Sequence, residues 1–122
     1  MKQLEHTEQC SLIKWWSYAC HNFGVREECL FAIPNGGFRH IVVAMKLKSE
    51  GVRSGVPDLF LAVPRGKYAG LFIEMKKARG GRASDNQKSL LTTFRSVGYA
   101  GGICHGWLAA KALIEQYFAG TL

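Results

Sequence analysis

The sequence lacks the features that mark secreted, membrane-bound or repetitive proteins. Its four cysteines include no C-x-x-C pair and no zinc-finger spacing to a histidine, so we expect buried free thiols in a reducing compartment. There is no long apolar run, and the polar N-terminal residues predict neither a signal peptide nor a membrane span. Repeats and low-complexity segments are also absent. We therefore expect one compact cytoplasmic domain over residues 1–122.

Acidic residues are scarce relative to basic ones. The chain has 9 Asp and Glu against 16 Lys and Arg, which gives a net charge of +7. In so small a protein this excess favours a polyanionic partner, DNA or RNA, although a basic soluble protein without such a partner is equally compatible with it. Hydrophobic residues make up 48% of the chain, which is enough for a packed core and argues against disorder.

Four segments are predicted to be helical. Apolar residues recur at helical spacing in residues 4–22, where Gly24 follows, and again in residues 107–118. Residues 84–97 begin at Ser84, a good N-cap, and end before Gly98. Residues 38–48 are also predicted to be helical, although their β-branched side chains leave a strand as the alternative.

Four short apolar runs predict strands at residues 29–33, 58–63, 71–76 and 99–104. Residues 64–70 would join the two central strands, and equal strand lengths predict pairing of Val63 with Leu71 and of Asp58 with Lys76. The order is helix, strand, helix, strand, strand, helix, strand, helix. This order predicts an α/β fold, a mixed central sheet of about four strands flanked by helices.

The run Glu74-Met75-Lys76 ends a strand that is otherwise apolar. Alternate side chains of a strand share a face, so Glu74 and Lys76 point to one side and Met75 to the other. Burying a carboxylate and an amine there is costly unless they are paired or bound to a metal. The alternative is a strand end that is open to solvent, where both charges need no explanation.

Asp58 adds a second carboxylate at the same end of the predicted hairpin. Carboxylate oxygens are the ligands that Mg²⁺ and Mn²⁺ prefer, and Lys76 would then orient or deprotonate a water that attacks a phosphate. A surface cluster of ion pairs is the alternative. The convergence of three chemically matched groups favours a metal-dependent site.

The pattern Pro57-Asp58 followed by Glu74-x-Lys76 is the signature of the PD-(D/E)xK nuclease superfamily. Its context adds Gly51-Val-Arg-Ser-Gly-Val before Pro57, Ser84-x-x-Gln87 after the second strand, and Pro34-Asn-Gly-Gly-x-Arg39 upstream. Together these motifs, from about Glu5 to Phe118, resemble the virus-type replication-repair nuclease (VRR-NUC) family, and most closely its stand-alone phage-type members. The resemblance implies a restriction-endonuclease-like fold and divalent-metal cleavage of DNA.

The resemblance also implies roles for individual residues. Asp58 and Glu74 would be metal ligands, with the backbone carbonyl of Met75 as a further candidate; Met75 departs from the more usual leucine but faces away from the site. Lys76 would activate the water, and Gln87 would orient the water or a neighbouring phosphate. Gln87 has a structural alternative, because Ser84 and Gln87 form the pattern of a capping box.

The first predicted helix offers one more carboxylate, from Glu5 or Glu8. The family pattern has glutamate followed four residues later by glutamine, which matches Glu5 and Gln9, and one of these acids would complete the metal shell. The alternative is an ordinary polar helix start, where acids are favoured by the helix dipole.

Basic and polar residues flank the predicted site and are candidates for contacts with DNA phosphates. Each one alone is also compatible with a solvated surface charge, whereas the three tryptophans fit core positions better than stacking platforms. The candidates are Asn35, Arg39, Lys46, Arg53, Lys77, Arg79, Arg82 and Lys88.

These patterns and the resemblance predict a structure-selective DNA endonuclease that requires Mg²⁺ or Mn²⁺, acts on branched DNA such as four-way (Holliday) junctions, and leaves 5′-phosphate and 3′-hydroxyl ends. A non-catalytic DNA-binding module of the same fold and an RNA nuclease are the alternatives. Paired cuts need two sites, so we also expect a homodimer, with residues 38–47 as its apolar patch. We expect no organic cofactor and no membrane partner, and a host-cell cytoplasm if a phage encodes the chain.

Overall fold

The computed structural model describes residues 3–34 and 41–122, and its elements follow the predicted order. The helices are α1 (Gln3–Ala19), α2 (Ile41–Ser49), α3 (Asp85–Ser96) and α4 (Trp107–Ala119), with short 3₁₀ turns at Cys20–Phe23 and Glu27–Cys29. The strands are β1 (Leu30–Ala32), β2 (Leu59–Leu61), β3 (Leu71–Lys76) and β4 (Ala100–His105).

The four strands form one mixed sheet in the order β1-β2-β3-β4. β1 pairs with β2 and β2 with β3 in antiparallel fashion, whereas β4 runs parallel to β3 after the crossover through α3. The prediction of a mixed sheet flanked by helices is therefore confirmed.

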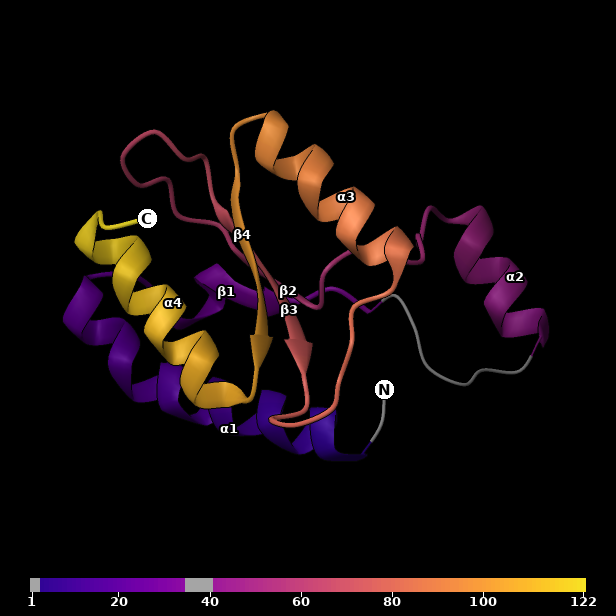
Figure 1. Cartoon of the computed structure of the whole chain (residues 1–122), viewed down its shortest axis with the longest axis horizontal. Coiled ribbons are helices and arrows are strands. Elements are labelled where there is room, and N and C mark those ends of the chain that lie inside the picture. The colour runs from indigo at the N-terminus through magenta and orange to yellow at the C-terminus, as the bar shows by residue number, and fades with distance from the viewer. Residues whose placement is uncertain (1–2, 35–40) are drawn as a thin grey trace.

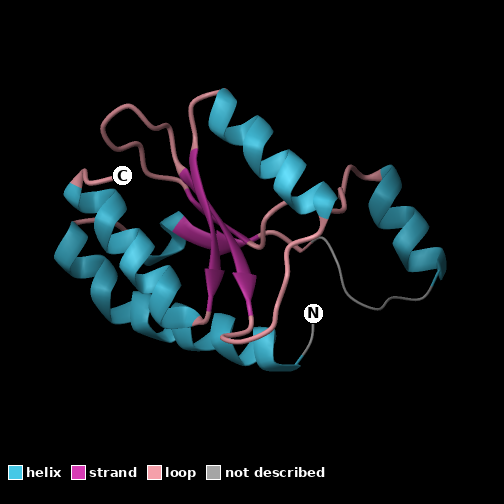
Figure 2. Ribbon diagram, in the orientation of Figure 1, coloured by secondary structure: helices cyan, strands magenta, loops and turns pink. Residues whose placement is uncertain are grey.

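Helices cover both faces of this sheet (Figure 2). The core side chains of β3, namely Leu71, Ile73 and Met75, belong to one apolar cluster with residues of α1 and α4. On the opposite face Phe72 stacks on Phe94 of α3, with ring centroids 4.5 Å apart. Figure 1 shows α1 and α4 side by side against the sheet and α3 apart from them, while α2 stands away from the body of the molecule.

The predicted register of the central hairpin is wrong by two residues. Leu59 pairs with Ile73 and Leu61 with Leu71, so the register continues to Asp58 opposite Glu74 rather than opposite Lys76. β2 ends at Leu61 rather than at the predicted Val63. Pro64 has no N–H to donate to the ladder, and the chain turns between Arg65 and Tyr68 around Gly66, whose φ is +58°. Because side chains alternate with a period of two, the shift leaves every residue on its predicted face.

Other differences lie at the ends of elements. The first predicted helix ends at Ala19 and continues only as a 3₁₀ turn, which Gly24 closes with a φ of +71°. The four cysteines are free, as predicted, but only Cys20 and Cys104 are buried, while Cys10 is exposed on α1. Trp16 is a core residue, and Trp15 and Trp107 pack against the core, as predicted. Within residues 3–34 and 41–122, none of the helices combines the length and the apolar composition that a transmembrane span requires.

Candidate functional site

The site begins at Asp58, immediately before β2. Its Oδ2 accepts a hydrogen bond of 2.8 Å from the backbone N–H of Met75, so the side chain takes a position that a ladder bond would otherwise occupy. Its backbone carbonyl accepts a bond of 2.7 Å from the N–H of Ile33. Asp58 is therefore fixed from both neighbouring strands, and it sits at the edge where β2 begins and β3 nears its end.

Glu74 and Lys76 lie on the face of β3 that carries Phe72, toward α3. They are the charged side chains that are buried in the described part of the chain, with exposed fractions of 3% and 8%. Lys76 Nζ lies 3.4 Å from Glu74 Oε2. The prediction that both share one face is confirmed, and the alternative of a strand end open to solvent is wrong for these two residues.

The carboxyl groups of Asp58 and Glu74 both lie near the single positive charge of Lys76. Burial, and then the negative charge of Asp58, raise the pKa of Glu74 to about 8, and Lys76 only partly offsets this rise. Burial also raises the pKa of Asp58, against the opposing hydrogen bond from Met75. The charge of Asp58 disfavours a second charge on Glu74, so at neutral pH the pair tends to hold a proton.

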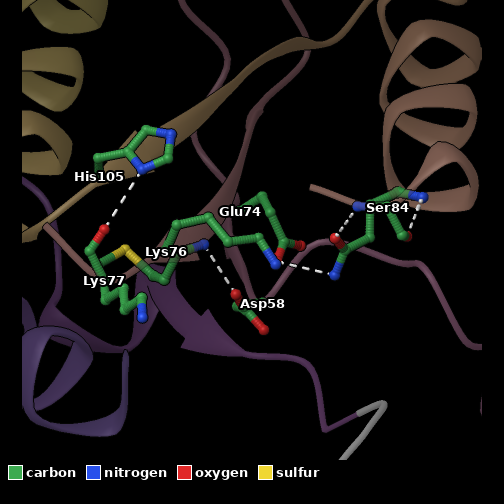
Figure 3. Close-up of polar contacts among 8 residues, drawn as sticks. Asp58, Glu74, Lys76, Lys77, Ser84 and His105 are labelled. Atoms are coloured by element: carbon green, nitrogen blue, oxygen red, sulfur yellow. Dashed lines mark hydrogen bonds and ion pairs between the residues drawn. The ribbon is translucent and has the colours of Figure 1, made fainter. Parts of the chain in front are cut away.

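The first turn of α3 closes the site on its other side (Figure 3). Ser84 Oγ accepts from the backbone N–H of Gln87 at 3.1 Å, and Gln87 Oε1 accepts from the N–H of Ser84 at 2.8 Å. This capping box leaves the amide nitrogen of Gln87 free to donate to Glu74 Oε2 at 3.1 Å. Gln87 therefore caps α3 and contacts Glu74 at the same time, and its role in orienting a water or a phosphate stays a prediction.

The two acids of α1 are placed differently. Glu8 Oε1 accepts a hydrogen bond of 2.7 Å from the backbone N–H of Trp107, and so it caps α4 in place of Gly106, which has no side chain. The charge of Glu5 acts on Asp58 and contributes to the rise in its pKa. One turn after Glu5, Gln9 has a buried Oε1 that finds no hydrogen-bond partner among the described residues.

The donor set fits a hard divalent cation. Asp58 and Glu74 present carboxylate oxygens, and the raised pKa of both groups marks a place where a positive charge would stabilise their charged forms. Within the described residues no cluster of three or more His, Cys, Asp and Glu side chains forms a ready metal cage. A two-carboxylate site is what Mg²⁺ and Mn²⁺ commonly use, since they keep several waters.

The predicted DNA-contacting residues divide into three groups. Asn35 and Arg39 lie outside the described residues. Lys77 follows β3 directly. The loop from Arg79 to Arg82 packs closely on the end of β3, since a Cβ on Gly81 would lie 3.1 Å from the Cβ of Lys76. The others are exposed: Lys46 on α2, Arg53 five residues before Asp58, and Lys88 on α3 directly after Gln87.

The structure adds His105, which the sequence did not single out. It pairs with Lys76 in the parallel register, so its side chain shares the face of Lys76 and Glu74, and its ring is exposed. Its Nδ1 lies 3.3 Å from the carbonyl oxygen of Lys77 (contact drawn in Figure 3); because a carbonyl only accepts, this contact is a hydrogen bond when Nδ1 carries a proton. No local motif marks this residue, since its placement depends on strand pairing.

Comparisons with known proteins agree with this geometry. The family model described as "VRR-NUC domain" matches residues 1–107. A solved structure described as "VRR_NUC domain protein" superposes with a TM-score of 0.78 at 25% identity, covering 96% of this chain and 89% of that one. A search of curated proteins gives no match.

The fold and the site therefore define a nuclease-type domain in which a mixed sheet carries Asp58, Glu74 and Lys76 at one end. The chain belongs to the VRR-NUC family. The resemblance identified from the sequence motifs is confirmed, and with it the fold.

Proposed function

We propose that this protein is a divalent-metal-dependent DNA endonuclease whose active site consists of Asp58, Glu74, Lys76 and Gln87. The observation that carries the proposal is the burial of Glu74 and Lys76 beside Asp58 at the end of the sheet. A protein that only binds DNA has no use for a buried Glu74 carboxyl group beside a second, half-buried one at Asp58, because such a pair repels phosphate and destabilises the fold. Metal-dependent hydrolysis of a phosphodiester uses such a pair to hold the cation.

Each residue has a defined task in this proposal. Asp58 and Glu74, with Glu5 in preference to Glu8, would hold Mg²⁺ or Mn²⁺, and the carbonyl of Met75 is a further candidate ligand. The bound cation would lower the pKa of a water and offset charge on the phosphate. Lys76, whose Nζ lies 3.4 Å from Glu74 Oε2, would orient or deprotonate the attacking water, and its positive charge would stabilise the negative charge that develops on the phosphate. Gln87 holds the Glu74 carboxylate in position.

Glu5 is preferred to Glu8 for a geometric reason. Glu8 is engaged by the N–H of Trp107, and releasing it would uncap α4. Glu5 acts on Asp58 through its charge without such a commitment among its described contacts. Calorimetry with Mn²⁺ distinguishes the two, since Glu5→Gln should weaken cation binding while Glu8→Gln, which keeps the acceptor for Trp107, should not.

The substrate proposed is branched DNA, and the protein is proposed to act as a homodimer. A chain with one site needs a partner to cut two strands in a paired way. The homodimer is supported by α2, on which Ile41 and Met45 are 70% and 64% exposed. Because a helix of nine residues is too short to be stable by itself, these exposed apolar side chains would gain stability from a partner surface. Phe38, also part of the predicted patch, lies outside the described residues.

A cleavage panel tests the proposed function. Duplex, flap, single-stranded and four-way-junction DNA, together with matched RNA, are incubated with Mg²⁺ or Mn²⁺ and with EDTA. We expect cation-dependent cutting of DNA, greatest for the junction, with loss of cutting but not of binding in Asp58→Ala. Cutting in EDTA would refute metal dependence, and cutting of RNA alone would establish the RNA nuclease instead.

Light scattering tests the homodimer separately. We expect a mass of twice one chain at micromolar concentration and a single-chain mass for Ile41→Asp with Met45→Asp. A single-chain mass for the unmodified protein would refute the dimer while leaving the nuclease proposal intact.

A further inference from the structure

The first turn of α3 holds more than Glu74. Asn86, next to Gln87, donates from its amide Nδ2 to the backbone carbonyl of Ser54, a bond of 3.1 Å that spans 32 residues of sequence. Ser54 lies four residues before Asp58. Two neighbouring side chains of one helical turn therefore hold the two chain segments that carry the two carboxylates.

The contact between α3 and this loop is close. A Cβ on Gly55 would lie 2.3 Å from Asn86 Nδ2, 2.8 Å from its Cγ and 3.1 Å from Leu90 Cδ1, so a larger residue would displace the Asn86 side chain. Gly55 also has a φ of +86°, a conformation that other residues rarely adopt. The loop is therefore fixed both by a hydrogen bond and by steric fit.

We propose that Asn86 is a positioning residue for the metal site, holding Asp58 at its working separation from Glu74 through the Ser54–Gly55 backbone. This inference rests on the proposed function, because it concerns the cation site of the proposed nuclease. Gln87 fixes Glu74 to α3, and Asn86 fixes the approach to Asp58 to the same turn. Groups that orient metal ligands without touching the metal commonly change affinity about 10- to 100-fold when removed.

The chain supplies a matched control at the other end of the same helix. Arg95 donates from Nε and Nη2 to the carbonyl oxygen of Gly101 in β4, at 3.2 and 2.7 Å. Arg95→Ala thus loosens α3 from the sheet at its C-terminal end, away from the carboxylates. If Asn86 mattered only for general docking of the helix, the two substitutions would have similar effects.

The experiment is calorimetric titration of Mn²⁺ into the full chain without DNA, with melting curves to show that each variant is folded. We expect Asn86→Ala, and Asn86→Leu, which keeps the branching of the side chain but has no N–H to donate, to weaken Mn²⁺ binding about tenfold. Arg95→Ala should stay within about twofold of the unmodified protein even if its melting temperature falls. Unchanged affinity in the Asn86 variants, or equal losses in Asn86→Ala and Arg95→Ala, would overturn the inference.

A second arm uses Gly55. Gly55→Ala places a methyl group against Asn86 and also strains the backbone at a φ of +86°, so it should displace the Ser54–Gly55 segment and weaken Mn²⁺ binding at least as much as Asn86→Ala does. Unchanged Mn²⁺ affinity in a folded Gly55→Ala protein would overturn the inference. If the unmodified protein binds no Mn²⁺, the proposed function fails, and the inference fails with it; if it binds Mn²⁺ and cuts DNA while Asn86 proves neutral, only the inference fails.

Discussion

Burial of Glu74 beside Asp58 makes the stability of the metal-free protein depend on pH, and Glu74→Gln should remove most of that dependence. The folded carboxyl has a pKa of about 8, raised by burial and by the Asp58 charge from its ordinary value of 4.5. Between these values the folded state holds a proton that the unfolded chain has released. Stability is therefore full below pH 4.5 and falls as the pH rises toward 8.

The size of the effect follows from the shift. One proton contributes about 1.4 kcal/mol per pH unit, so the protein loses about 3 kcal/mol between pH 4.5 and pH 7. The pKa of Asp58 is also raised by burial, and its contribution has the same sign. In a domain of this size about 3 kcal/mol corresponds to a difference in Tm of roughly 10 °C.

The assay is thermal unfolding in EDTA at pH 5, 6, 7 and 8, followed by circular dichroism. The unmodified protein and Glu74→Gln should melt at similar temperatures at pH 5 and diverge at higher pH, with the variant the more stable. Mn²⁺ should restore stability at pH 8 in the unmodified protein more than in the variant. Parallel curves for the two proteins would refute the assignment of a retained proton to Glu74.

Three further predictions follow from other contacts. Lys76→Ala should slow single-turnover cleavage roughly a hundredfold or more while calorimetry shows Mn²⁺ still bound; collapse of that affinity would assign Lys76 a structural role. Arg79→Ala with Arg82→Ala should lower the slope of log affinity against log salt by about 2 for duplex DNA, and an unchanged slope would exclude this loop from the DNA contact. Glu8→Ala should cost about 1 kcal/mol in urea unfolding, since Trp107 loses its acceptor, without slowing cleavage; a slowed rate would place Glu8 in the site.

Sequence patterns predicted β3 to the residue, because a continuous apolar run followed by Glu74 and Lys76 leaves little freedom in where the strand lies. They failed on its register with β2. That strand has only three residues, so its pairing is set by the turn after Leu61 rather than by its length. Asp58 and Glu74 still lie close together despite the wrong register, because a shift of two residues leaves each side chain on the same face of the sheet.

The site was predictable where its residues belong to local motifs. Asp58, Glu74, Lys76 and the capping box of Gln87 each have a sequence signature, and the capping box is present as expected. His105 and Asn86 have none: one depends on which residues β3 and β4 pair, the other on how α3 docks on a distant loop. Such placements follow from tertiary packing, which a single sequence does not specify.

We propose that Asp58 and Glu74 hold the cation used for cutting DNA. The most direct measurement is nicking of supercoiled plasmid by the unmodified protein and by Asp58→Asn in Mn²⁺, at protein concentrations that give equal DNA occupancy. Asparagine keeps the size of the side chain and an oxygen acceptor for Met75, and it removes the negative charge. Nicking should occur with the unmodified protein in Mn²⁺, stop in EDTA, and be lost in Asp58→Asn; equal nicking by Asp58→Asn, or nicking that persists in EDTA, would contradict the claim.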